Sequence, residues 1–364
     1  MKAVVARDYG GPDSLAVEEV PLPRPGSSQI QVRIRATALN PADLRTLSGV
    51  LRGLAPLEFP HVLGSDFAGT VTEVGPDVAR FAVDDEVFGV GLPRSTGKMA
   101  TMLSTPPSLT TGTMAQYAVF EADTPAIARR PDKLDAERAA TLPIAGLTAL
   151  SLLRAGRFEV PGKESSAAGQ GVVLVTGAAG GVGSAVVPLL AAAGVHVIAT
   201  AIPDDDQYAL DLGAAEVIDY HSVDVIAETM RRHPEGVDAL INLALPGPAL
   251  VEASRVIRPG GRLLNAAFPS PDPSAFDGAG LTVQTVYSTA RPGDLDRLAA
   301  HALDNTLPST ISRRYALAHA PQAYADLVNT HVRGKLLVTI APETSVATAV
   351  PISNAVRRTG VSIG

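Results

Sequence analysis

The sequence contains no cysteine among its 364 residues. This absence excludes disulfides, thiolate nucleophiles and any zinc site that needs a cysteine ligand. The N-terminal segment MKAVVARDYGGPDSL lacks the apolar run of a signal peptide, and longer apolar stretches such as AVVPLLAAAGVHVIATA are interrupted by glycine, proline or histidine. We therefore expect a cytoplasmic protein with no membrane span.

Lysine and arginine are also fewer than aspartate and glutamate, with 30 basic against 37 acidic residues. The formal net charge is −7 and the sequence pI is about 5.5, which argues against binding to nucleic acid or to an anionic membrane. Hydrophobic residues make up 46% of the chain, so a chain of this length can form two domains with buried cores.

Two different hydrophobic patterns divide the sequence into an N-terminal and a C-terminal part. The first part is β-rich, and the segment QIQVRIRATAL (29–39) alternates as a half-buried strand does. From about Leu147, short apolar strands alternate with helical segments, as in GVVLVTG followed by GSAVVPLLAAAG. This alternation predicts a parallel sheet covered on both faces, and hence an α/β fold. Two long loops, Gly91–Thr113 and Gly156–Gln170, and a surface tail after Ile340 complete the prediction.

A glycine-rich turn is the most informative segment, VVLVTGAAGGVGSAVV. Gly180 lets the backbone approach a pyrophosphate at a helix N-terminus, and Gly183 lets the helix pack closely on the preceding strand. Ala178 stands at the first position of the strict G-x-G-x-x-G pattern, and Pro188 falls inside the predicted helix, where we expect a kink. A tight strand–helix turn without a ligand is the alternative. We expect a dinucleotide to bind at Gly180, Gly181, Val182 and Gly183.

The second strand of this region, VHVIATA, lacks the terminal acid that binds an NAD ribose. Thr200 stands there instead and leaves room for a 2′-phosphate, which favours NADPH over NADH. Three aspartates (204–206) follow with no neighbouring cation, so Arg333 or Lys335 would have to pair with the phosphate.

Several segments occur in the order typical of one superfamily: NPADLRTLSG, HVLGSDFAGTVTEVG, LPIAGLTAL, VTGAAGGVGSAVV, LGAAEVIDY, RPGGRLL and RGKLLVTI. In these segments the chain resembles the medium-chain dehydrogenase/reductase superfamily, in its zinc-independent quinone oxidoreductase and enoyl reductase branch. The resemblance covers about residues 1–340. It implies a GroES-like β-barrel catalytic domain (1–145, completed by 290–342), a Rossmann domain with a doubly wound parallel sheet (146–289), and a tail (343–364).

The resemblance also locates the positions of a catalytic zinc. Zinc-dependent members bind their metal through a cysteine near the position of Asn40 and a His–Glu pair at those of Ser65 and Asp66. Neither Asn40 nor Ser65 is a credible zinc ligand. Since the seven histidines are scattered along the chain, we expect no metal site.

Other site residues are implied by the same resemblance. Asn40 faces the nicotinamide and the substrate, Thr148 lies near the nicotinamide ribose, and Tyr220 packs by the adenosine 2′-phosphate. Leu51 stands where many members have a tyrosine that is a candidate proton donor in enoyl reductases.

The expected function is therefore a zinc-independent, NADPH-dependent reductase of quinones or of the conjugated C=C bond of enones. A biosynthetic enoyl reductase with a larger substrate is the first alternative, and a non-catalytic NADPH-binding scaffold is the second. The substrate would bind between the domains. The alternating segment near Leu281–Ser288 predicts a strand that pairs with its copy in a homodimer.

Overall fold

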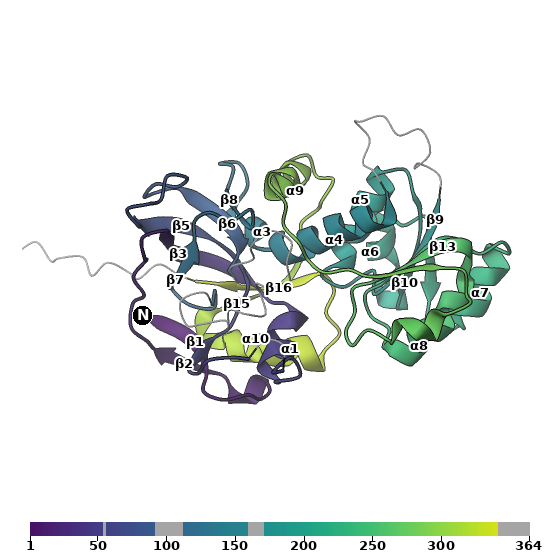
Figure 1. Cartoon of the computed structure of the whole chain (residues 1–364), viewed down its shortest axis with the longest axis horizontal. Coiled ribbons are helices and arrows are strands. Elements are labelled where there is room, and N and C mark those ends of the chain that lie inside the picture. Colours follow the sequence, from purple (N-terminus) through teal and green to yellow (C-terminus); the bar gives the residue numbers. More distant parts are fainter. Residues whose placement is uncertain (54–55, 92–111, 159–170, 341–364) are drawn as a thin grey trace, which may run out of the picture.

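The computed structural model describes residues 1–53, 56–91, 112–158 and 171–340 (Figure 1). Most of the two predicted loops and the whole predicted tail lie outside these residues. The chain forms two parts side by side, and its C-terminal strands return to the part built from the N-terminal residues (Figure 1).

The first part contains a three-stranded and a seven-stranded sheet. The smaller sheet has the order β2–β1–β4, from Ala16–Glu19, Lys2–Ala6 and His61–Val62. The larger has the order β15–β16–β3–β5–β6–β8, with β7 paired to β3. Its strands are β15 (Ile311–Ala316), β16 (Lys335–Thr339), β3 (Gln29–Ala38), β5 (Asp66–Val74), β6 (Glu86–Val90), β8 (Ile127–Arg129) and β7 (Tyr117–Glu121).

Alternate residues of β3 contribute side chains to the hydrophobic core of this part. Ile30, Val32 and Ile34 point to one cluster of buried side chains, which also contains Phe67 and the fully buried Tyr324 of α10. The helices of this part are α1 (Pro41–Leu47), α3 (Ala136–Ala140) and α10 (Ala320–Asn329).

The second part is one parallel sheet of six strands in the order β11–β10–β9–β12–β13–β14. Its strands are β9 (Val172–Thr176), β10 (His196–Ala201), β11 (Glu216–Asp219), β12 (Val237–Asn242), β13 (Ile257–Asn265) and β14 (Thr282–Thr285). The strand order reverses between β9 and β12. In doubly wound folds, ligands bind beyond the carboxyl ends of the strands at such a point.

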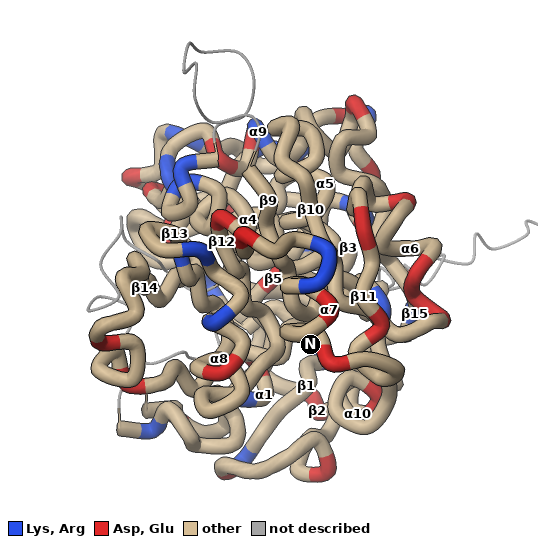
Figure 2. The backbone as a smooth tube through the Cα atoms, turned by 90° about the vertical axis from the view of Figure 1, so that its right-hand side faces the viewer, with Lys and Arg blue, Asp and Glu red and all other residues tan. Residues whose placement is uncertain are grey.

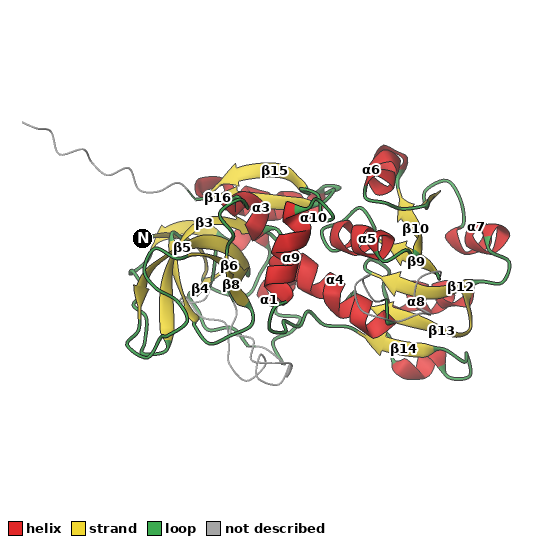
Figure 3. Ribbon diagram, turned by 90° about the horizontal axis from the view of Figure 1, so that it is seen from above, coloured by secondary structure: helices red, strands yellow, loops and turns green. Residues whose placement is uncertain are grey.

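Helices cover both faces of this sheet (Figure 3). Val173 and Val175 of β9 pack with residues of α4 and α5, whereas Leu174 packs with Leu250 and Ala253 of α8. The helices are α4 (Pro143–Gly156), α5 (Gly183–Ala192), α6 (Asp206–Asp211), α7 (Val225–Arg232) and α8 (Gly247–Ala253), and α9 (Asp294–Leu303) lies between the two parts, against α4 and β8. The predicted α/β fold, with a β-rich part and a doubly wound sheet, is confirmed.

Pro188 lies inside α5, as predicted, and the helix continues to Ala192. The strand expected near Leu281–Ser288 is shorter, because β14 covers only Thr282–Thr285.

Within the described residues, no helix is long and apolar enough to cross a membrane. Acidic and basic residues are interspersed over the outer end of the second part (Figure 2).

Candidate active site

Asn40 lies at the point where β3 gives way to α1. It is the N-cap of α1, and its backbone N–H donates to Asp43 Oδ2 (3.1 Å) in a capping box. The side chain is almost completely buried, with 4% of the residue exposed. The sequence NPAD therefore has a local structural reason: Asn40 caps, Pro41 occupies the first turn, and Asp43 closes the box.

Lys335 lies directly across the sheet from Asn40. The antiparallel register of β16 and β3 pairs Leu337 with Ala38, and continuing it places residue 335 opposite residue 40. Lys335 Nζ donates to Asn40 Oδ1 (2.6 Å), to the carbonyl oxygen of Leu39 (3.0 Å) and to Asp66 Oδ2 (3.2 Å). Its side chain is 3% exposed. This position differs from our expectation for Lys335, since its ammonium is engaged beside Asn40 and is not free to pair with a 2′-phosphate.

Asp66 completes this buried network. Its Oδ2 also accepts from Asn40 Nδ2 (3.0 Å), and its Oδ1 accepts from the backbone N–H of Ile144 at the start of α4 (2.8 Å). Asp66 is fully buried, so its negative charge is compensated by the Lys335 ammonium and by these two donors. The carboxylate therefore joins three separate segments of the chain.

A second buried carboxyl group lies next to this network. Asp43 accepts from Ser65 Oγ (2.7 Å) and from the hydroxyl of Tyr324 (3.2 Å). Burial raises the pKa of Asp43 to about 6, and the neighbouring charge of Asp66 adds to this, while the bonds from Ser65 and Asn40 oppose it. Burial and Asp43 raise the pKa of Tyr324 well above its usual value. Sequence reasoning missed Tyr324, which lies 281 residues from Asp43.

The glycine-rich turn between β9 and α5 has the shape that a dinucleotide needs. Gly177 has a φ of +71°, and a Cβ at Gly183 would collide with the carbonyl oxygens of Gly177 and Ala178. A Cβ at Gly180 would meet nothing closer than the Gly177 carbonyl oxygen at 3.4 Å, so space is open in front of it. Among the described residues, no group accepts from the backbone N–H of Val182 or Gly183. These N–H groups at the start of α5 fit a pyrophosphate.

Gly181 lies beside the Lys335 side chain. A Cβ at this position would lie 2.9 Å from Cδ of Lys335, so the lysine side chain runs past the turn. The backbone N–H of Gly334 also donates to the Ala179 carbonyl oxygen (2.8 Å). The turn that fits the cofactor is therefore in direct contact with the segment that carries Lys335.

Arg333 lies near the end of β10, where an adenosine ribose is expected. Its guanidinium carbon is 5.1 Å from the centre of the Tyr208 ring, and its Nη1 is 3.9 Å from Asp205 Oδ1. Asp205 is buried and also contacts His331 Nε2 at 2.5 Å. Half of the Arg333 side chain is exposed, so it remains available to a phosphate.

Thr200 and Tyr220 lie near the same end of β10. Thr200 is 5% exposed and pairs with Ile218 of the neighbouring strand. Tyr220 is 45% exposed, and its backbone N–H donates to the Ala201 carbonyl oxygen (3.3 Å). Thr148 lies elsewhere, inside α4, where its hydroxyl donates to the Ile144 carbonyl oxygen (2.7 Å). The structure thus brings Asn40 and Lys335 together, with the glycine-rich turn next to Lys335, and gathers Thr200, Tyr220 and Arg333 near the end of β10, whereas Thr148 belongs to neither group.

Sequence reasoning also missed a row of polar residues at the carboxyl ends of three adjacent strands. Thr176 Oγ1 donates to Asn242 Oδ1 (2.7 Å), and Asn242 Nδ2 donates to Asn265 Oδ1 (2.8 Å). All three residues are buried. The available signal was that VLVT, LIN and LLN each end an apolar strand with a polar residue.

Comparisons with known proteins agree with this architecture. The family described as "Alcohol dehydrogenase GroES-like domain" matches residues 26–132, and the one described as "Zinc-binding dehydrogenase" matches residues 212–338. A chloroplast envelope quinone oxidoreductase homolog of Arabidopsis thaliana is 30% identical over 352 residues, covering 93% of this chain and 98% of that protein.

Solved structures share the fold over nearly the whole chain. Quinone oxidoreductase of Escherichia coli complexed with NADPH superposes with a TM-score of 0.78 at 21% identity, over 93% of this chain and 100% of that one. An NAD-dependent alcohol dehydrogenase gives a TM-score of 0.79 at 28% identity, over 94% and 100%. The chain therefore belongs to the medium-chain dehydrogenase/reductase superfamily, in the branch of the quinone oxidoreductases, and is an oxidoreductase.

Proposed function

We propose that the protein is an NADPH-dependent reductase that works without zinc and reduces quinones or the conjugated C=C bond of enones. The observation that carries this proposal is the contact of the Lys335 ammonium with both Asn40 and Asp66. These two residues stand at zinc-ligand positions of the metal-dependent relatives.

The chemistry of these residues does not fit a catalytic zinc ion. An amide at position 40 replaces a thiolate, and the Ser65 hydroxyl is bound to Asp43. Lys335 Nζ binds Asn40 Oδ1 (2.6 Å) and Asp66 Oδ2 (3.2 Å) at the same time, so the ammonium occupies the position between these two residues that a metal ion would need. The Lys335 ammonium, in place of a metal ion, compensates the negative charge of Asp66.

A site without a Lewis acid favours particular hydride acceptors. Reduction of an isolated ketone creates a localised alkoxide, which needs a metal ion or a strong proton donor. Addition of hydride to a conjugated enone creates an enolate whose charge is spread, so hydrogen bonds suffice to stabilise it until a solvent water protonates it to complete the reduction. NADPH supplies the hydride when it is bound.

The chain's own residues would bind and orient the reactants. The open space at Gly180 and the N–H groups of Val182 and Gly183 suit the pyrophosphate, and exposed Arg333 suits the 2′-phosphate. Lys335 and Asp66 hold the Asn40 amide in one orientation, because they engage its oxygen and its nitrogen. We propose that this fixed amide orients the oxygen of the substrate.

An NADPH oxidation assay tests the proposal. Quinones and enones should be reduced before and after treatment with a chelator, while simple alcohols should give little or no reaction with NADP⁺. Asn40→Ala should lower turnover by roughly ten- to a thousandfold with NADPH affinity little changed. Asn329→Ala, at an exposed position on α10, is the matched control.

The outcome of these assays distinguishes several cases. Alcohol oxidation that disappears with a chelator and returns with zinc would contradict the zinc-independent assignment. If Asn40→Ala lowers the melting temperature and leaves the turnover of the folded protein unchanged, Asn40 only caps α1 and does not orient the substrate.

A further inference from the structure

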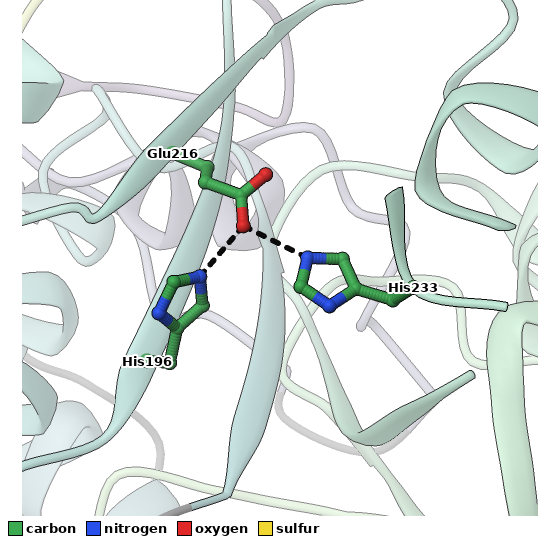
Figure 4. Close-up of side chains that lie close together, drawn as sticks. All are labelled: His196, Glu216 and His233. Atoms are coloured by element: carbon green, nitrogen blue, oxygen red, sulfur yellow. Dashed lines mark hydrogen bonds and ion pairs between the residues drawn. The ribbon is translucent and has the colours of Figure 1, made fainter. Parts of the chain in front are cut away.

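Three side chains that can bind a metal ion converge at the amino ends of β10 and β11 (Figure 4). His196 Nε2 lies 2.6 Å from Glu216 Oε1, and His233 Nε2 lies 2.8 Å from the same oxygen. The three ligand atoms lie within 4.8 Å of one another. The expectation that the histidines are scattered is thus wrong for this pair, because the fold brings together residues that are distant in sequence.

Each ligand is carried by a defined structural element. His196 begins β10, Glu216 begins the neighbouring strand β11, and His233 is the C-cap of α7. Their side chains are 42%, 22% and 20% exposed, respectively. The cluster is therefore partly shielded by the protein and still reachable from solvent.

Arg232 orients the carboxylate of this cluster. Its Nη1 lies 3.2 Å from Glu216 Oε2, and its Nε donates to Glu228 Oε1 (2.7 Å). The arginine thus binds the oxygen that faces away from the histidines and leaves Oε1 directed at both imidazoles (Figure 4). Glu216 thus uses both of its carboxylate oxygens, one toward the two imidazoles and one toward the guanidinium. A hydrogen-bonded carboxylate of this kind is typical of metal sites.

We propose that His196, Glu216 and His233 bind a divalent transition-metal ion, with Zn²⁺ as the ion that two imidazoles and one carboxylate suit best. Water would complete a tetrahedral set. Ligand atoms around a tetrahedral zinc are about 3.4 Å apart, so each imidazole nitrogen must move about 0.6–0.8 Å away from Glu216 Oε1. The exposure of His196 and His233 permits this rotation. In the bound state both imidazoles are neutral, with Nε2 on the metal and the proton on Nδ1.

This site is separate from the reaction site. It lies at the amino ends of parallel strands, whereas the glycine-rich turn follows the carboxyl end of β9. Since β11 is an edge strand, a metal ion here would clamp the edge of the sheet to β10 and to the end of α7. We assign it a structural role, and the assignment does not depend on the proposed reductase activity.

The test uses the tag-free, full-length protein after removal of metal with a chelator. Titration calorimetry with ZnCl₂ should show one equivalent bound, and Zn²⁺ should raise the melting temperature. His196→Gln and His233→Gln should each weaken binding at least tenfold, and Arg232→Gln should weaken it about tenfold through Glu216. His319→Gln, at an exposed histidine outside the cluster, is the control and should bind as the original protein does.

Circular dichroism establishes that each variant is folded. If a histidine variant does not fold, the visible spectrum of the original protein with one equivalent of Co²⁺ tests the geometry of the site instead. A tetrahedral Co²⁺ site absorbs strongly and an octahedral one weakly. Absence of one-equivalent binding, a weak octahedral Co²⁺ spectrum, or binding unchanged in both histidine variants would overturn the proposal. Since catalysis should be the same with and without Zn²⁺, these results leave the test of the proposed function independent.

Discussion

The side chain of Lys335 passes over Gly181 on its way to Asn40, so closely that a Cβ at position 181 would lie 2.9 Å from Lys335 Cδ. Gly181→Ala should therefore displace the lysine. We expect a loss of turnover larger than the loss of NADPH affinity, together with a lower melting temperature. Turnover, nucleotide titration and thermal melting on one preparation measure all three.

Gly180→Ala is the matched variant in the same turn. The free protein has room for this Cβ, so the melting temperature should stay nearly unchanged. The methyl group would occupy the space where the backbone meets a pyrophosphate, and NADPH affinity should fall at least about tenfold. Similar behaviour of the two variants would show that Lys335 does not depend on Gly181.

Removal of the Lys335 charge should destabilise the fold. Lys335→Met leaves the fully buried Asp66 without its cation, and loss of one partner of a buried pair costs about 3–5 kcal/mol in the free energy of unfolding. The double variant Lys335→Met/Asp66→Asn should recover part of this loss. Urea denaturation measures both, and Lys2→Met at an exposed position of β1 should change stability by less than about 0.5 kcal/mol. If Lys335→Met were as stable as the original protein, the Lys335–Asp66 pair would not stabilise the fold.

Asp43 should make stability depend on pH in an unusual direction. Its folded-state pKa of about 6 is higher than that of the unfolded chain, so the folded state binds the extra proton between about pH 4 and pH 6. The free energy of unfolding should therefore fall as the pH rises through this range. Relative to Asp43→Asn, which does not titrate, the original protein should lose about 1–3 kcal/mol from pH 4 to pH 7.

Urea denaturation of both proteins across this range provides the comparison. Asp326 is the control of opposite sign, since hydrogen bonds from Tyr315 and Gln322 lower the pKa of its carboxyl. Relative to Asp326→Asn, the original protein should lose stability as the pH falls. Parallel curves for the original protein and Asp43→Asn would show that Asp43 does not titrate in this range.

Arg333 should determine the preference for NADPH. Arg333→Ala removes the exposed cation near the end of β10 and should weaken NADPH binding about tenfold, with NADH binding unchanged. Arg231→Ala, on the exposed side of α7, is the control. We choose Arg333 over Thr200 for this test, because Thr200 is buried and a carboxylate introduced there would be desolvated. Equal losses for both nucleotides would assign Arg333 to a shared part of the cofactor.

The edge strand β14 should join two copies of the chain. Its residues alternate in exposure, and its outer backbone edge has no strand partner among the described residues. We expect a homodimer, which Gln284→Lys should weaken by placing like charges opposite each other. Gln207→Lys on α6 is the control, and sedimentation measures the mass. A monomer at all concentrations would reject the dimer.

Local sequence signals predicted the fold well, and long-range contacts explain what they missed. Gly183 and the apolar strand before it identify the turn, because both requirements are local. The contact of Lys335 with Asn40 has no local signal, since it depends on the register of β16 and β3 across 295 residues. His196 and His233 carry no sequence pattern, because only the parallel strands and α7 bring them to Glu216.

The return of the chain to its first sheet has a consequence for the order of synthesis. β16 lies between β15 and β3, so the strand that carries Lys335 is absent while most of the chain is being made. Until it arrives, the carboxyl end of β3 has no neighbour on that side, and Asp66 has no cation. The second part, whose six strands all precede residue 290, can fold during translation. The domain that begins first on the ribosome is thus the last to be finished, and the second part is complete before Lys335 can reach Asn40 and Asp66.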